Sequence, residues 1–178
     1  MILSSVGSTV LEDVAFAAPE SLKWIQVYIF RSREVTRNIV ERAEKAGFKA
    51  VVVTVDAVIG KRLTDFKNHS LLEPHLIHLP NIEASQVSEA KKSSNFEHSS
   101  GLAFNRFADS MVDSSISFEI VDWLKSMTKL PIILKGILRA DDAREAVARG
   151  VDAVIVSNTG GRQLDCVPAT VSAYTGVC

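Results

Sequence analysis

The 178-residue sequence has only two cysteines, Cys166 and Cys178, and no apolar run near the length of about 18 residues that a membrane-spanning helix needs. Two cysteines imply no disulfide framework, so a reducing compartment is the default expectation. The 20 basic and 21 acidic residues are dispersed, which leaves no electrostatic footprint for nucleic acid. The opening segment MILSSVGS lacks the basic start and apolar core of a signal peptide. The sequence therefore predicts a globular protein that binds neither nucleic acid nor membrane.

Short apolar runs of strand length recur along the chain, at residues 1–3, 24–30, 50–55, 131–135 and 153–158. Helical patterns lie between most of them, at residues 33–47, 118–128 and 141–150. In the first of these, Gly47 stands where a C-terminal cap belongs. Runs such as residues 51–53 lack polar alternation, which favours strands covered on both faces. The strand–helix–strand order favours a parallel sheet, so the predicted class is α/β.

Small or reactive polar residues stand at or near the carboxyl end of each run: Ser4 and Ser5, Gln26 and Tyr28, Thr54 and Asp56, Lys135, and Ser157 and Asn158. A (β/α)8 barrel builds its active site from several strand ends at once, whereas a doubly wound sheet uses one or two. No G-x-G-x-x-G motif follows any run. We therefore predict an incomplete (β/α)8 TIM barrel with about five of its eight strand–helix units. Its outer edges, at residues 1–3 and 153–157, are expected to lack partners.

Residues 57–116 are long, polar and serine-rich, with little periodicity. Such a segment is typical of a lid, a binding loop or disorder. The four histidines of the chain, His69, His75, His78 and His98, all fall in this segment and have no metal-ligand spacing. The sequence thus predicts a long loop here and no metal site.

Several motifs, in the same order along the chain, resemble the FMN-dependent 2-hydroxy-acid oxidase family, of which glycolate oxidase is the familiar member. They are WIQVYIFRSREVT, VVVTVDAVIGKRLTD, LPIILKGI, ADDAREAV and VSNTGGRQLDCVPAT. The resemblance predicts a partial FMN hydroxy-acid dehydrogenase domain over residues 1–171 and a divergent tail over 172–178. The family's first barrel strand and its last strands have no counterpart in the pattern.

The resemblance implies oxidation of a small 2-hydroxy acid to a 2-oxo acid, with electrons passed to FMN and then usually to oxygen, giving hydrogen peroxide. It also implies a homo-oligomer and a peroxisomal or otherwise cytoplasmic protein, although the final Gly-Val-Cys is not a peroxisomal tripeptide. Positions that match the family's flavin contacts are Ser4, Gln26, Thr54, Lys135 and Ser157. Positions that match its substrate contacts are Tyr28, Arg62 and Arg162, and Tyr28, which could hold the hydroxyl oxygen, is also a candidate catalytic residue.

Elementary chemistry agrees with these roles, because an ammonium such as Lys135 favours the negative charge of a reduced flavin and a guanidinium grips a carboxylate with two hydrogen bonds. From residue type alone, a tyrosine such as Tyr28 on an apolar strand is more often a core aromatic, and an arginine such as Arg162 is usually a surface charge; the motifs around them favour the active-site roles. The segment DAVIGKR, which carries Arg62, is one residue shorter than the family's usual motif and lacks its proline.

Thr159 stands where the family has the histidine that removes a substrate proton. A hydroxyl has no accessible basic form near pH 7, so general-base assistance of about 10²–10⁴ in rate is expected to be lost. Three interpretations follow. The chain is an oxidase of this type with impaired turnover, a non-catalytic fragment that at most binds flavin or associates with full-length relatives, or a different flavin barrel resembling dihydroorotate dehydrogenase. The last accounts for Lys135 but not for GGRQLDCVPAT.

Overall fold

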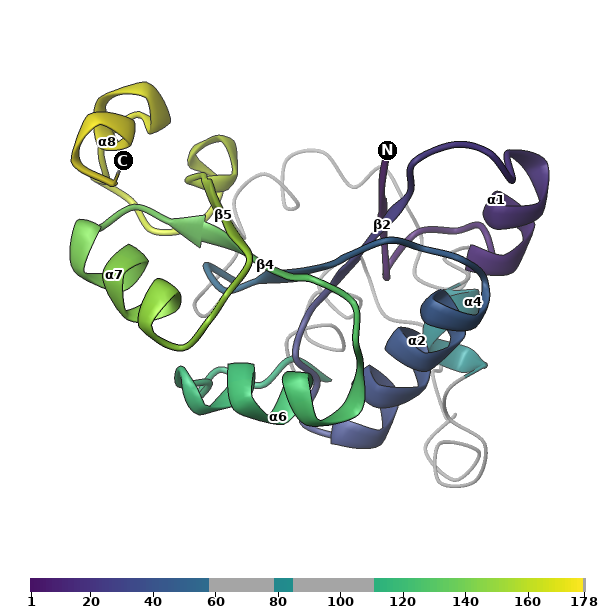
Figure 1. Cartoon of the computed structure of the whole chain (residues 1–178). Coiled ribbons are helices and arrows are strands. Elements are labelled where there is room, and N and C mark those ends of the chain that lie inside the picture. The colour runs from purple at the N-terminus through teal and green to yellow at the C-terminus, as the bar shows by residue number, and fades with distance from the viewer. Residues whose placement is uncertain (58–78, 85–110, 178) are drawn as a thin grey trace, which may run out of the picture.

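The computed structural model describes residues 1–57, 79–84 and 111–177. One sheet contains β1 (Ile2–Ser4), β2 (Trp24–Val27), β3 (Val51–Thr54), β4 (Ile132–Ile137) and β5 (Ala153–Val156). The strands stand side by side in chain order, and every neighbouring pair is parallel (Figure 1). This order is that of consecutive barrel strands and differs from a doubly wound sheet, whose order reverses at a switch point. The predicted α/β class and partial barrel are confirmed.

The helices follow the strands on the outer side of the sheet. The predicted helices at 33–47, 118–128 and 141–150 correspond to α2 (Arg33–Lys45), α6 (Glu119–Met127) and α7 (Ala140–Ala148). Four further elements have no counterpart in the sequence prediction: α1 (Leu11–Ala17), α4 (Pro80–Glu83), the 3-10 turn η3 (Thr159–Gly161) and α8 (Thr170–Val177). Helix α8 occupies most of the predicted tail, and Ala173 in it is buried.

Helix α2 ends as its sequence predicts. Gly47 adopts a left-handed conformation with φ 85°, its amide donates to the carbonyl of Glu44 at 3.1 Å, and the Phe48 amide donates to that of Ala43 at 3.0 Å. These two bonds satisfy carbonyls that the last turn of the helix leaves without partners. Phe48 is buried directly afterwards, so the turn delivers the chain into β3.

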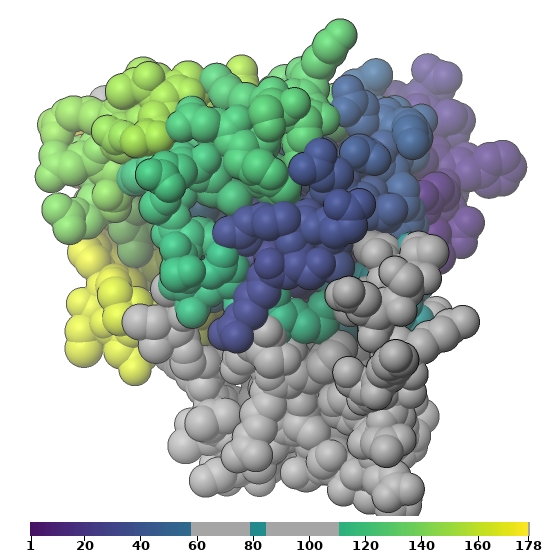
Figure 2. Space-filling view, turned by 90° about the horizontal axis from the view of Figure 1, so that it is seen from below, coloured from purple at the N-terminus to yellow at the C-terminus, as the bar shows by residue number. Residues whose placement is uncertain are grey.

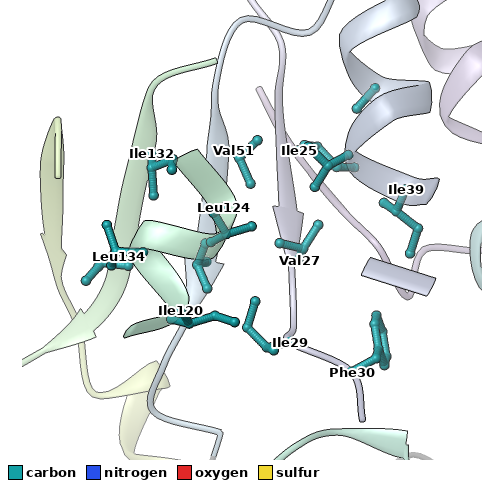
Figure 3. Packing of buried hydrophobic residues seen from close by; sticks show 14 of the residues in the cluster. Ile25, Val27, Ile29, Phe30, Ile39, Val51, Ile120, Leu124, Ile132 and Leu134 are labelled. Carbon is teal, nitrogen blue, oxygen red and sulfur yellow. The ribbon is translucent and has the colours of Figure 1, made fainter. Parts of the chain in front are cut away.

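The core lies between the outer face of the sheet and the helices. Alternate strand residues, including Val27, Val51 and Leu134, pack with Ile120 and Leu124 of α6, as Figure 3 shows. The other strand face carries a smaller buried group, formed by Ala50, Val52 and Ile133 with Trp24 and Ile155 against it. Apolar residues on both faces explain the absence of polar alternation in these runs.

Two parts of the predicted 57–116 loop lie in the described structure, and both are packed against the body of the protein. Helix α4 (Pro80–Glu83) carries Asn81, whose side chain accepts from the Leu11 amide at 2.9 Å and donates to the Thr9 carbonyl at 3.0 Å. Ile82 beside it is 3% exposed. A short helix therefore interrupts the expected loop.

The end of the same segment returns to the carboxyl end of β2. The Arg31 amide donates to the Met111 carbonyl at 2.8 Å, and Arg33 pairs with Asp113 at 2.6 Å. Hydrogen bonds from the Ser115 hydroxyl and amide, followed by that from Arg33, lower the pKa of Asp113 to about 2. From there the chain enters α6, which lies beside α2 on the face seen in Figure 2.

Candidate functional site

A hydrogen-bonded row of polar side chains crosses the carboxyl ends of β1, β2 and β3. The Ser4 hydroxyl donates to the Gln26 amide oxygen at 3.0 Å, and the Gln26 amide nitrogen donates to the Thr54 hydroxyl at 2.7 Å. Ser4 and Gln26 are direct partners in the β1–β2 register. Gln26 and Thr54 are 8% and 6% exposed, so the row is fixed inside the protein. The structure thus brings together three of the residues that the sequence singled out.

A second group of polar side chains lies beside this row, from β4 to the loop after β5. Lys135 is the register partner of Thr54, and its ammonium donates to the Thr159 hydroxyl at 3.2 Å. The Thr159 hydroxyl in turn donates to the Asp56 carboxylate. An anion, a hydroxyl and a cation therefore meet at the carboxyl end of the sheet. Asp56 is a site residue that the sequence analysis noted at a strand end but did not assign.

Gly136 makes room for Asp56. A Cβ at Gly136 would lie 2.7 Å from the Asp56 Cβ and 2.9 Å from its backbone nitrogen, closer than real Cβ atoms approach. Gly136 also has φ 113°, which side chains other than glycine rarely adopt. The β4–β5 register shifts between Lys135 and Ile137, on either side of this glycine. The glycine of the ILKG motif thus positions the carboxylate of the adjacent strand.

The loop after β5 is held by its own side chains. The Asn158 side-chain oxygen accepts from the amides of Gly160 and Gly161 at 3.1 Å and 3.3 Å, and the Ser157 hydroxyl accepts from the Thr159 amide at 3.0 Å. Thr159 is left with φ 53°, a conformation that is a genuine outlier for a β-branched residue and costs about 1–3 kcal/mol. Such strain persists only where surrounding contacts impose it, and here they aim the Thr159 hydroxyl at Asp56.

Tyr28 and Arg162 lie near this cluster. The Arg162 side chain is exposed and donates to the Thr159 carbonyl at 2.9 Å. Burial raises the pKa of Tyr28, the negative charge of Asp56 raises it further, and the positive charge of Arg162 opposes both. Tyr28 is therefore a protonated hydrogen-bond donor at neutral pH. Arg62, the remaining predicted substrate contact, lies outside the described residues, as do the four histidines.

A cavity of about 220 Å³ opens beside the cluster on the loop side. The cavity is lined by Asp56, Gly136, Leu138, Asn158, Gln163, Leu164 and Val167.

Among the described residues no group of three or more His, Cys, Asp or Glu side chains is placed to hold a metal ion. In the same part of the chain no helix is long and apolar enough to cross a membrane.

Residues 1–177 match the family model described as FMN-dependent dehydrogenase. The chain belongs to this family. It is 48% identical over 172 residues to 2-hydroxyacid oxidase 1 of Mus musculus, covering 96% of this chain and 45% of that protein. A peroxisomal (S)-2-hydroxyacid oxidase of Arabidopsis thaliana is 40% identical over 178 residues, with 99% and 46% covered.

Solved structures also resemble this chain. Mandelate oxidase with (S)-4-hydroxymandelic acid superposes with a TM-score of 0.78 at 32% identity, covering 99% of this chain and 49% of that one. A flavocytochrome b2 mutant with pyruvate bound gives a TM-score of 0.72 at 30% identity, covering 99% and 37%. The chain thus spans about half the length of the curated relatives it matches. It covers 37% and 49% of the two solved structures.

The polar row has the donor chemistry that the family's cofactor, FMN, requires. The Gln26 amide has two N–H donors and directs one to Thr54, the Thr54 hydroxyl accepts that bond and keeps its own proton, and Lys135 has three donors with one directed to Thr159. Donors of this kind, held on neighbouring strands, suit the acceptor atoms of an isoalloxazine ring. The residues present therefore fit the cofactor.

Proposed function

We propose that the chain binds FMN at the carboxyl ends of its five strands and supports the FMN-dependent oxidation of a small 2-hydroxy acid to a 2-oxo acid. The supporting observation is the continuous hydrogen-bonded row from Ser4 through Gln26 to Thr54, with Lys135 beside it in register. A barrel of this class uses that end of its sheet for ligands.

Each residue of the row has a role that its chemistry supports. Gln26 and Thr54 orient the ring through their remaining donors, and Ser4 fixes the amide of Gln26 in one orientation. Bound FMN supplies the two-electron acceptor of the reaction. Lys135 places positive charge beside the ring and favours its reduced, more negative form. Ser157 acts indirectly, since its hydroxyl holds the Thr159 amide.

The substrate's polar groups find complementary side chains nearby. Arg162 offers a planar guanidinium to the substrate carboxylate, with one N–H already on the Thr159 carbonyl. Tyr28 donates to the substrate hydroxyl, because burial and the Asp56 charge keep its phenol protonated. The Arg62 guanidinium is proposed as a second carboxylate contact on the motif match alone.

Turnover is proposed to be slow because Thr159 holds the position of the family's base. Its hydroxyl donates to Asp56 and accepts from Lys135, and it has no basic form near neutral pH. Loss of a positioned base costs about 10²–10⁴ in rate. The same observation favours a second candidate function, a flavin-binding protein without catalysis that associates with further copies or full-length relatives.

The acceptor and the location are proposed from the relatives. Proteins similar to this chain carry the name oxidase, and those of Arabidopsis thaliana are named peroxisomal. We propose dioxygen as the final acceptor, with hydrogen peroxide as product, and a peroxisomal site of action.

The test is anaerobic flavin reduction. The full chain is titrated with FMN, binding is measured by quenching of flavin fluorescence, and glycolate or a longer 2-hydroxy acid is then added without air. Binding with slow bleaching of the flavin absorbance supports the proposal, and binding without bleaching supports the second candidate. Absence of FMN binding refutes both. Lys135→Met is the matched variant for the proposed role of the Lys135 charge, because it keeps the length of the side chain and removes its charge.

A further inference from the structure

Hydrogen bonds connect Lys135, Thr159 and Asp56 at the position where the family has its base. Without that base, the substrate's hydroxyl proton needs another acceptor. Oxidation of a 2-hydroxy acid requires the hydroxyl proton to leave, and Thr159 itself cannot hold a second proton near neutral pH. Yet the Thr159 hydroxyl donates a hydrogen bond to the Asp56 carboxylate. A hydroxyl placed in this way can receive one proton while it passes on another.

We propose that Asp56 is the acceptor of the substrate's hydroxyl proton and that the Thr159 hydroxyl relays the proton between them. The substrate O–H bond breaks as a new O–H bond forms on Thr159 Oγ1, and the proton that Thr159 carried moves to Asp56 Oδ2. Thr159 ends unchanged, the substrate oxygen loses one proton and Asp56 gains one. The C2–H bond breaks as well, and its hydrogen and two electrons would be taken up together by bound flavin, so this inference rests on the proposed function.

The neighbouring groups leave Asp56 as the acceptor. Lys135 and Arg162 are cations that donate hydrogen bonds, and the raised pKa of Tyr28 keeps its phenol protonated. Of the residues that the structure gathers at this point, Asp56 alone carries an anionic oxygen. Its second oxygen, Oδ1, is buried and accepts no hydrogen bond within the described part of the chain, so the carboxylate keeps free acceptor capacity.

Two features hold the relay in place. Gly136 packs against the Asp56 Cβ and leaves no room for that side chain to retreat towards β4. On the other side, Asn158 and Ser157 impose the left-handed conformation of Thr159. The strained hydroxyl is thus held against the carboxylate from both directions, which is the pre-organisation that a proton transfer needs.

The relay predicts a binding preference that needs no turnover. The probes are 2-hydroxyisobutyrate, which has the carboxylate and hydroxyl of a substrate but no hydrogen on C2 to lose, and isobutyrate, which lacks the hydroxyl. Their dissociation constants are measured by calorimetry on the FMN-loaded full chain. Since a hydrogen bond ending on a charged group favours its partner by about tenfold or more, wild type should prefer the hydroxy acid by that factor.

Three variants separate the relay from a structural contact. Thr159→Ser keeps the hydroxyl and should keep the preference, whereas Thr159→Val keeps the shape without the hydroxyl and Asp56→Asn removes the charge. The last two should reduce the preference by about tenfold, to what the hydrogen bond from Tyr28 sustains by itself. Flavin reduction by a 2-hydroxy acid should fall at least about tenfold in the same two variants and persist in Thr159→Ser.

The outcomes distinguish the two proposals. An undiminished preference in Thr159→Val or Asp56→Asn overturns the relay and leaves the proposed function standing. If wild type binds neither FMN nor the two acids, the proposed function fails and the relay with it. Circular dichroism and thermal unfolding establish that each variant folds; should Asp56→Asn not fold, the matched pair of Thr159 variants decides.

Discussion

Replacing Thr159 by histidine is expected to accelerate flavin reduction by about 10²–10⁴-fold, the usual contribution of a positioned general base. The structure already provides for that side chain. Asp56 lies where it accepts a hydrogen bond from residue 159, and an imidazole N–H pointing at it would leave the other ring nitrogen free to take a proton. Histidine also tolerates φ 53° better than a β-branched residue, so the backbone need not move.

The assay is stopped-flow bleaching of the flavin absorbance without air, compared between Thr159→His and Thr159→Asn. Asparagine is the matched control, because it accepts the left-handed conformation and donates to Asp56 but takes up no proton. The histidine variant should also reduce flavin faster as pH rises through about 6.5, since the base works in its neutral form. Equal rates in the two variants, at normal FMN affinity, would refute the assignment of position 159 as the place of the base.

Three further outcomes test the fold beneath the site. Gly136→Ala should lower the free energy of unfolding in urea by about 2 kcal/mol or more, because its new Cβ meets Asp56. Gly47→Ala is the control: Gly47 has φ 85° and open space around it, so this variant should lower the free energy of unfolding by about 1 kcal/mol. Leu124→Ala should cost about 2–5 kcal/mol, since Leu124 is 0% exposed in the core; a loss below about 1 kcal/mol would contradict that packing. The pKa of about 2 at Asp113 means that its ionised form stabilises the fold, so this stability is present above about pH 4 and disappears as pH falls towards about 2. Asp113→Asn should unfold more easily at pH 7 and lose less on acidification.

The strands and three main helices were predictable because their patterns are local. Periodicity and length identified β3 and α2, and the Gly47 cap marked the end of α2. Helix α1 escaped because its sequence, LEDVAFA, is short and leaves Phe16 88% exposed, so its apolar pattern is weak. Helix α4 has only four residues, and the Asn81 side chain anchors it to a segment about 70 residues earlier, a contact that no local pattern encodes.

The placement of the candidate site residues was predictable where it depends on the residue's own strand. Ser4, Gln26, Thr54 and Lys135 lie side by side because parallel strands align their carboxyl ends. The role of Asp56 depends on two distant residues, Gly136 and Thr159, and the sequence shows neither contact. The available signal was period two along the strand, since Asp56 follows Thr54 by two positions and so extends the same face. Asn158 was noted as a strand-end residue, but its hold on the loop emerges only from the backbone conformation.

The amide side chain of Asn158 has a consequence for how this protein tolerates change. The Asn158 side-chain oxygen accepts hydrogen bonds from the amides of the two glycines after position 159. These bonds hold the bend of the loop and do not involve the side chain at position 159. The conformation of the loop is therefore set apart from the side chain at position 159, so a substitution there should change the reactive group and leave the bend in place.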